Sequence, residues 1–166
     1  MKKQFKRKKL LPNILIVLVI VYFQAPLIYN SFKQENKVIK PVTLIDLQNN
    51  IVDFPVDGKQ VYLFWATWCG PCHLQMSYLE LTLSESQLSS IVAISLGENP
   101  KTVNKFLKKN PLSFKVLIAP SSDSWQHFGV KATPSTMFLN KDGRVDYFSS
   151  GLSFLFPLRV WFLNLL

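Results

Sequence analysis

The fold of this 166-residue chain is decided by one stretch, Val61-Tyr-Leu-Phe-Trp-Ala-Thr-Trp-Cys69-Gly-Pro-Cys72. It holds the only two cysteines of the sequence, three positions apart. The first five residues are apolar and β-prone, as in a strand that is covered on both faces of a sheet. After the second cysteine, Leu74, Tyr78 and Leu81 recur at helical spacing. The stretch therefore predicts a buried strand, a short loop with two cysteines, and a helix.

Two cysteines at this spacing form a small reversible disulfide, attach a haem or share a metal. In the disulfide interpretation, Cys69 lies at a helix N-terminus, where unpaired N–H groups lower the pKa of its thiol. Gly70 and Pro71 suit that position, because proline in a first helical turn loses no hydrogen bond. We therefore expect Cys69 to be the exposed nucleophile and Cys72, one turn deeper, to resolve the mixed disulfide.

The haem interpretation comes from His73, which completes the attachment pattern C-x-x-C-H. Met76 or Met137 would then supply a sixth ligand to the iron. The strongly β-like run before the motif argues against it, because a haem pocket would displace the core of that sheet. A zinc site would need Cys69, Cys72, His73 and His127 together, although neighbouring Cys72 and His73 cannot easily bind one ion. A purely structural disulfide would gain little, because the closed loop is so short.

The charge distribution indicates a membrane rather than a nucleic acid. Residues 1–9 carry six of the positive charges and no negative one, which leaves +3 of the total +9 for the remainder. Residues 10–29 carry no charge, include ten consecutive apolar side chains over 14–23, and just reach the length that spans a bilayer. Basic residues stay on the cytoplasmic side of a membrane. We therefore expect a cytoplasmic arm (1–9), a transmembrane anchor (10–29) and an exported remainder.

A cleaved signal peptide is the alternative interpretation of the same segment. Its apolar core has a suitable length, but Phe23 stands two residues before Ala25, where a small side chain is expected. In both cases the main domain lies outside the cytoplasm, in the periplasmic or other extracytoplasmic space, where disulfides persist.

Residues 30–41 are polar and predict a short linker, and residues 42–166 predict one α/β domain. The alternation of strands and helices ends in a β-hairpin around Asn140-Lys-Asp-Gly143. Residues 152–166 are apolar but short and contain Pro157, which indicates a final helix over the sheet. The expected strands are 43–47, 51–54, 61–65, 91–95, 116–118, 135–139 and 144–149, with helices at 71–83, from 100 onward, and at 125–128.

A second motif, Lys131-Ala-Thr-Pro-Ser135, precedes the strand at 135–139. Together with Phe64–Cys72 it resembles the thioredoxin superfamily, and more narrowly the membrane-anchored TlpA/ResA/DsbE group of thiol–disulfide oxidoreductases. The tail around Gly151 and Trp161 is similar to the ScsD-type branch. The resemblance covers residues 42 to 166. It implies a thioredoxin fold with a central mixed β-sheet, flanking helices and an inserted strand–helix segment at about 91–110.

The resemblance also implies the parts of a site. Pro134 would be a cis-proline facing the Cys69–Cys72 disulfide, although spacing alone favours an ordinary trans bond. Thr133 would offer backbone hydrogen bonds to an extended substrate. Trp68, with Gly70 and Pro71, would line the substrate groove. No cofactor or metal is implied, and the partners would be protein thiols or disulfides and a redox partner at the membrane.

Two positions depart from the family pattern. Leu63 stands where thioredoxin has a buried aspartate, and Gln75 stands where many TlpA-like proteins have a glutamate. Water, His73 or Glu80 would then have to take the proton of Cys72, and the direction of the reaction stays open between reductase and oxidase. The sequence thus predicts an extracytoplasmic thiol–disulfide oxidoreductase. A c-type haem protein and a non-catalytic thioredoxin-fold binding module are the alternatives.

Overall fold

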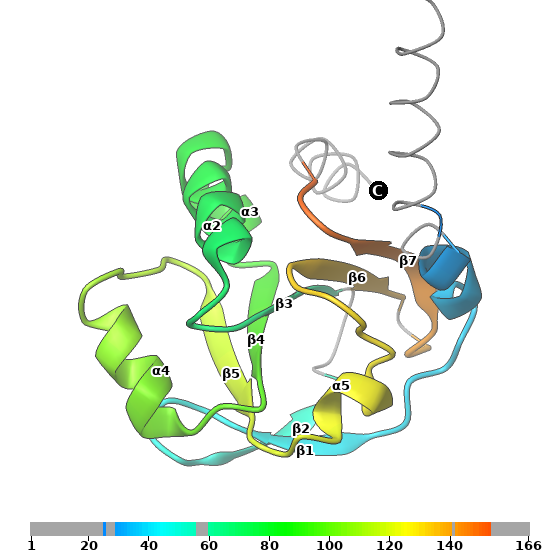
Figure 1. The fold of residues 1–166 in the computed structure, drawn as a ribbon, viewed down its shortest axis with the longest axis horizontal. Helices are drawn as coiled ribbons and strands as arrows, with labels where there is room; N and C mark the ends of the chain where they lie inside the picture. The colour runs from blue at the N-terminus through cyan, green and yellow to red at the C-terminus, as the bar shows by residue number, and fades with distance from the viewer. Residues whose placement is uncertain (1–24, 26–28, 56–59, 141, 154–166) are drawn as a thin grey trace, which may run out of the picture.

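The computed structural model describes residue 25 and residues 29–55, 60–140 and 142–153. Its centre is a seven-stranded mixed sheet in the order β2-β1-β5-β4-β3-β6-β7 (Figure 1). The strands are β1 Val42–Ile45, β2 Ile51–Phe54, β3 Gln60–Trp65, β4 Ile91–Leu96, β5 Lys115–Ala119, β6 Ser135–Leu139 and β7 Val145–Ser150. The helices are α2 Gly70–Thr82, α3 Glu85–Leu88, α4 Pro100–Leu107 and α5 Ser124–His127.

Strand directions follow the lengths of the connections. β3, β4 and β5 are parallel neighbours, joined by crossovers that contain α2 with α3 and then α4. β6 and β7 form an antiparallel hairpin, and β1 and β2 form another. The expected strand–helix segment at about 91–110 is present as β4 and α4. The thioredoxin-like α/β fold with a mixed sheet and flanking helices is thereby confirmed.

Two apolar layers cover the sheet, one on each face. Val61, Leu63 and Trp65 of β3 face the layer that contains α2 and Val103 of α4. Tyr62 and Phe64 face the other layer, which contains Ile39, Phe128 and residues of β7. All of these β3 side chains are buried, which is why the sequence of this strand is apolar throughout.

Helix α2 begins where the sequence supplies a cap and a proline. Cys69 is the N-cap residue, and Pro71 occupies the first turn. Helix α4 begins in the same way: Asn99 caps it by accepting a 2.9 Å hydrogen bond from the N–H of Thr102, and Pro100 follows. Helix α2 ends at Thr82, within one residue of the predicted end. Helix α4 ends at Leu107, shortly before Asn110.

The segment predicted as a linker packs on the domain. Residues 29–34 are helical, and Asn30 and Gln34 are buried against the glycine at 129. The backbone then pairs with the strand end at 143–145, where Asn36 donates to Val145 at 2.8 Å. Figure 1 shows this segment in blue beside β7. The segment is therefore packed on the domain through Asn30, Gln34 and Ile39, while most of its other polar residues are exposed.

The predicted anchor, residues 10–29, and the predicted final helix lie almost wholly outside the described residues. Within the described part of the chain, no helix has the length and apolar character needed to cross a bilayer.

Candidate active site

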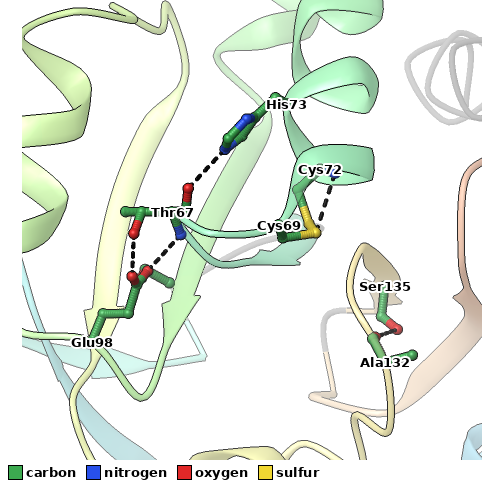
Figure 2. The surroundings of a disulfide bond; sticks show 8 residues. Thr67, Cys69, Cys72, His73, Glu98, Ala132 and Ser135 are labelled. Atoms are coloured by element: carbon green, nitrogen blue, oxygen red, sulfur yellow. Dashed lines mark hydrogen bonds between the residues drawn. A yellow bond between two sulfur atoms is a disulfide. The ribbon is translucent and has the colours of Figure 1, made fainter.

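Cys69 and Cys72 are joined in a disulfide at the N-terminus of α2 (Figure 2). The S–S distance is 2.00 Å and the Cα atoms are 5.2 Å apart. The backbone N–H of Cys72 points at the Cys69 sulfur, with an N–S distance of 3.2 Å. The same N–H lies 3.0 Å from the Cys69 carbonyl, so this first-turn donor is shared between the carbonyl and the sulfur of the N-cap residue. The same geometry stabilises a Cys69 thiolate once the disulfide is reduced.

Cys69 is less accessible than the sequence suggests, whereas Cys72 is buried as expected. Cys69, which was expected to be exposed, retains only 3% of its surface, and Cys72 retains none. Their side chains belong to the apolar layer under α2, with Trp65 and Met76. The order of accessibility agrees with the expectation, since Cys69 is the outer residue, but only a narrow part of it faces solvent.

The second motif lies at the same end of the sheet. Phe64 of β3 pairs with Ser135 of β6, so the loops that leave β3 and enter β6 are neighbours. The Thr133–Pro134 peptide bond is cis, as the family resemblance implies. The turn is closed by the Ser135 hydroxyl, which donates to the Ala132 carbonyl at 2.7 Å (Figure 2). Gly151 of the neighbouring strand end donates its N–H to the Pro134 carbonyl at 2.7 Å.

Thr133 keeps its backbone groups available. Within the described residues, no hydrogen bond engages its N–H or its carbonyl, and its side chain is half-buried. A backbone donor and acceptor beside a strand end are what an extended peptide needs to add as a strand.

The other predicted groove residues are on the surface. Trp68 is 69% exposed, and its indole stacks on that of Trp125 with ring centres 6.4 Å apart. Gly70 and Pro71 are also exposed, whereas Pro134 is buried. Trp125, on α5, is a contact that the sequence did not indicate, because α5 is separated from the cysteines by more than fifty residues.

The two departures from the family pattern have different structural roles. Leu63 is buried in the apolar layer under α2. Gln75 is also buried, but its amide pairs with the backbone of Ser153: its Nε2 donates to the carbonyl at 3.1 Å, and its Oε1 accepts from the N–H at 2.8 Å. Gln75 therefore fixes the chain after β7 onto α2, which a carboxylate could do only in part.

Glu98 is a second residue near the site, after Trp125, that the sequence did not indicate. Its carboxylate accepts hydrogen bonds from the N–H of Thr67 at 2.8 Å and from the Thr67 hydroxyl (Figure 2). It also accepts from the Ser95 hydroxyl at 2.6 Å. Thr67 lies two residues before Cys69. A signal was available, because Glu98 follows β4 just as Thr67 follows β3, and parallel neighbours end at the same edge of the sheet. Glu80, considered at the sequence level, instead accepts from the N–H and hydroxyl of Ser113.

The contacts of the two histidine rings do not suit a metal or haem ligand. The Nε2 of His73 is 3.0 Å from the Thr67 carbonyl, and its ring packs on Phe106 at 4.7 Å. His127 contacts the Lys40 carbonyl. Met76 and Met137 lie in different apolar layers, so they do not converge on one side of His73. With both sulfurs in a disulfide, this arrangement does not fit a haem attachment site.

A mixed sheet, a Cys-x-x-Cys disulfide at a helix N-terminus and a neighbouring cis-proline define the class of thioredoxin-fold thiol–disulfide oxidoreductases. The match to the Redoxin family model over residues 33–151 places this chain in that family. Within the thioredoxin superfamily it belongs to the TlpA/ResA/DsbE-like group.

Curated relatives agree with this placement. The thiol-disulfide oxidoreductase ResA of Geobacillus thermodenitrificans is 29% identical over 158 residues, covering 88% of this chain and 90% of the relative. ResA of Bacillus subtilis is 33% identical over 91 residues, covering 53% of this chain and 51% of the relative. A thioredoxin-like protein of Haemophilus influenzae is 27% identical over 166 residues, covering 93% and 94%.

Solved structures share the fold. StoA of Bacillus subtilis superposes with a TM-score of 0.62 at 20% identity, covering 75% of this chain and 98% of StoA. A secreted disulfide oxidoreductase of Mycobacterium tuberculosis gives a TM-score of 0.59 at 20% identity, covering 72% and 94%.

Proposed function

We propose that this chain exchanges its Cys69–Cys72 disulfide with cysteine pairs of protein substrates outside the cytoplasm. The observation that carries the proposal is the disulfide at the N-terminus of α2, beside the cis Thr133–Pro134 turn. Cys69 and Cys72 are the catalytic residues, and Trp68, Gly70, Pro71, Thr133 and Pro134 form the substrate surface.

The exchange takes place in two substitutions at sulfur. In the reducing direction, the Cys69 thiolate attacks a substrate disulfide, a mixed disulfide forms, and one substrate sulfur leaves as a thiolate that takes up a proton. The Cys72 thiol then loses its proton, and its thiolate attacks the Cys69 sulfur and releases the second substrate thiolate. Two electrons pass to the substrate, and the Cys69–Cys72 bond closes. The oxidising direction reverses each step.

The geometry supports Cys69 as the attacking group. The Cys72 N–H points at the Cys69 sulfur, and Cys69 is the outer of the two sulfurs. Substrate would approach over Trp68 and extend along Thr133, whose backbone groups have no partner among the described residues.

Turnover of a protein disulfide tests the function. The purified domain, with a thiol reductant, should accelerate insulin reduction or reshuffle scrambled ribonuclease. Cys69→Ser should lose that activity, and Leu81→Ala, an exposed change on α2, is the matched control. An intact chain that accelerates neither reaction would contradict the enzyme and would favour the binding-module alternative.

The direction is tested by the redox potential of the Cys69/Cys72 couple. Equilibration with glutathione buffers measures it. A value near that of thioredoxin, about −270 mV, would make the chain a reductase, whereas one near that of DsbA, about −120 mV, would make it an oxidase.

The proposal places residues 1–9 in the cytoplasm and residues 10–29 in the cytoplasmic membrane. The charge pattern and apolar length of these residues support it. The folded domain then begins near residue 29, earlier than the composition suggests, because residues 29–39 pack on it. Membrane fractions should retain the full chain after carbonate washing. Release of the chain in a form shortened at about residue 25 would instead show a cleaved signal.

A further inference from the structure

A groove of about 260 Å³ lies between the active-site loop and α4. Thr67 forms the side nearest the cysteines. The other side comes from α4 and the residues after it: Thr102, Lys105, Phe106, Lys109 and Asn110. Phe106 is held in place by ring contacts with Trp65 at 5.3 Å and His73 at 4.7 Å. The groove is therefore built against Trp65, which shares an apolar layer with both cysteines, and against His73, which follows Cys72.

The groove is positively charged. Lys105 and Lys109 are both exposed, the first in the last turn of α4 and the second in the turn that follows it. Neither has an ion pair with any residue that the structure describes. The sequence from 99 to 115 contains five lysines and no acidic residue. The preceding acid, Glu98, has its carboxylate occupied by Thr67 and Ser95. A concave surface with charges of one sign attracts a ligand of the other sign.

The groove is also close to the chemistry. Thr67 precedes Cys69 by two residues, which is about 7 Å of extended chain. A substrate whose cysteine is joined to Cys69 therefore has flanking residues within reach of Lys105 and Lys109. Thr102 and Asn110 add hydroxyl and amide groups that suit carboxylates or a peptide backbone.

We propose that the groove binds an acidic segment flanking the reactive cysteine of a protein substrate. Asp or Glu side chains of that segment pair with Lys105 and Lys109 while the substrate sulfur meets Cys69. The inference depends on the proposed function, since it names the class of substrate that the same disulfide serves. A protein segment is favoured over an anionic lipid surface because the groove continues into the active-site loop.

Two disulfide peptides test the proposal. They share one cysteine pair, and one carries three glutamates where the other carries three glutamines. The ratio of their kcat/KM values is measured at low and high salt. We expect the wild-type chain to prefer the acidic peptide by about threefold to tenfold at low salt, and high salt should remove the preference. This comparison needs no variant.

The variant pair assigns the effect to the groove. Lys105→Glu with Lys109→Glu should abolish or reverse the preference. Lys101→Glu with Lys108→Glu makes the same charge change on exposed lysines outside the groove lining, and it should retain most of the preference. Thermal melting of both variants checks that the fold is intact.

The outcomes separate the inference from the function. Turnover of both peptides at equal rates would contradict the proposed binding of an acidic segment and would leave the proposed oxidoreductase function standing. Turnover of neither peptide would contradict the oxidoreductase function itself. Equal loss of preference in both variants would overturn the groove as the site. Binding of anionic vesicles that depends on Lys105 and Lys109, with no peptide preference, would assign the surface to lipid and contradict the proposal.

Discussion

The carboxylate of Glu98 holds the active-site loop by accepting both the N–H and the hydroxyl of Thr67, two residues before Cys69. The same carboxylate also accepts from the Ser95 hydroxyl at 2.6 Å. The loop between β3 and α2 is thereby tied to the end of the neighbouring strand β4. Because the Thr67 carbonyl in turn contacts His73, the tie extends into the first turns of α2.

Replacing Glu98 by glutamine should loosen this loop. The amide turns one acceptor oxygen into a donor that faces other donors, so we expect a loss of about 1–3 kcal/mol in the free energy of unfolding. We also expect slower exchange at Cys69, because the loop is no longer fixed. Urea unfolding and insulin reduction measure the two effects. Glu80→Gln is the matched control, since Glu80 also accepts an N–H and a hydroxyl, but from Ser113. If both variants slow thiol–disulfide exchange equally, the contact of Glu98 with Thr67 has no specific role in fixing the active-site loop.

Replacing Cys72 by serine should trap substrate on Cys69. The first substitution still occurs, but the resolving thiolate is absent, so the mixed disulfide accumulates. Non-reducing gels of the full chain should show adducts that disappear with reductant. Adducts through Cys72 in the Cys69→Ser variant, with none in Cys72→Ser, would reverse the two roles.

Changes at Gln75 should release the chain that follows β7. Gln75→Ala removes both hydrogen bonds to Ser153, and Gln75→Glu keeps an acceptor for the Ser153 N–H but loses the donor to its carbonyl. We expect each to destabilise the fold by about 1–3 kcal/mol, because a part-buried backbone group of Ser153 loses its partner. Hydrogen exchange at Ser153 should quicken in the alanine variant. Unchanged exchange there would show that the contact does not hold the segment.

Gly129→Ala should be strongly destabilising. Gly129 has a φ of +67°, and an added Cβ would lie 2.3 Å from the Gln34 side-chain oxygen. Gly151→Ala is the control for the backbone alone, because its φ is +92° but no atom lies within 4 Å of an added Cβ. We expect about 1 kcal/mol for Gly151 and about 2–4 kcal/mol for Gly129, measured by thermal unfolding. Equal losses would show that the helix at 29–34 does not press on this glycine.

Acid should weaken the β1–β2 hairpin through Asp46. The side-chain hydrogen bond from Asn50, aided by backbone N–H groups of Asn50 and Gln48, lowers the pKa of Asp46 below its usual 3.8. The stabilisation is therefore complete above that value and is lost as pH falls through the lower pKa of the folded state. NMR titration of Asn50→Ala should show the pKa rising toward 3.8. An unchanged titration would rule out Asn50 as the main cause.

The sequence predicts the parts of this fold in which residue type alone indicates burial or a helix end. β3 is apolar on both faces because both faces are covered, and Pro100 after Asn99 marks the start of α4. Short elements held by polar contacts were missed. Helix α3 has only four residues and no apolar period, although Ser84 and Gln87 form a capping pair, with Ser84 N–H to Gln87 Oε1 at 3.0 Å.

The candidate site divides in the same way, into residues that belong to a local sequence motif and residues that only a tertiary contact brings to the site. The cysteines carry a local motif that spacing reveals, whereas the cis bond at Thr133–Pro134 was expected only from the family resemblance, since spacing alone favours a trans bond. Glu98 and Trp125 carry none, because each contributes through a tertiary contact with the loop of Thr67 and Trp68. The segment at 30–41 resembles a linker because the buried Asn30 and Gln34 cannot be distinguished by residue type from the exposed polar residues around them.

The packing of residues 29–39 on the domain has a consequence for how the enzyme would meet its partners. With the proposed anchor directly before this segment, almost no slack chain separates the lipid from the catalytic body. The disulfide would then stay at one height and one orientation above the bilayer instead of sweeping a volume set by a flexible tether. Partners fixed in the same membrane would encounter it at a high local concentration only if their own thiols reach that height.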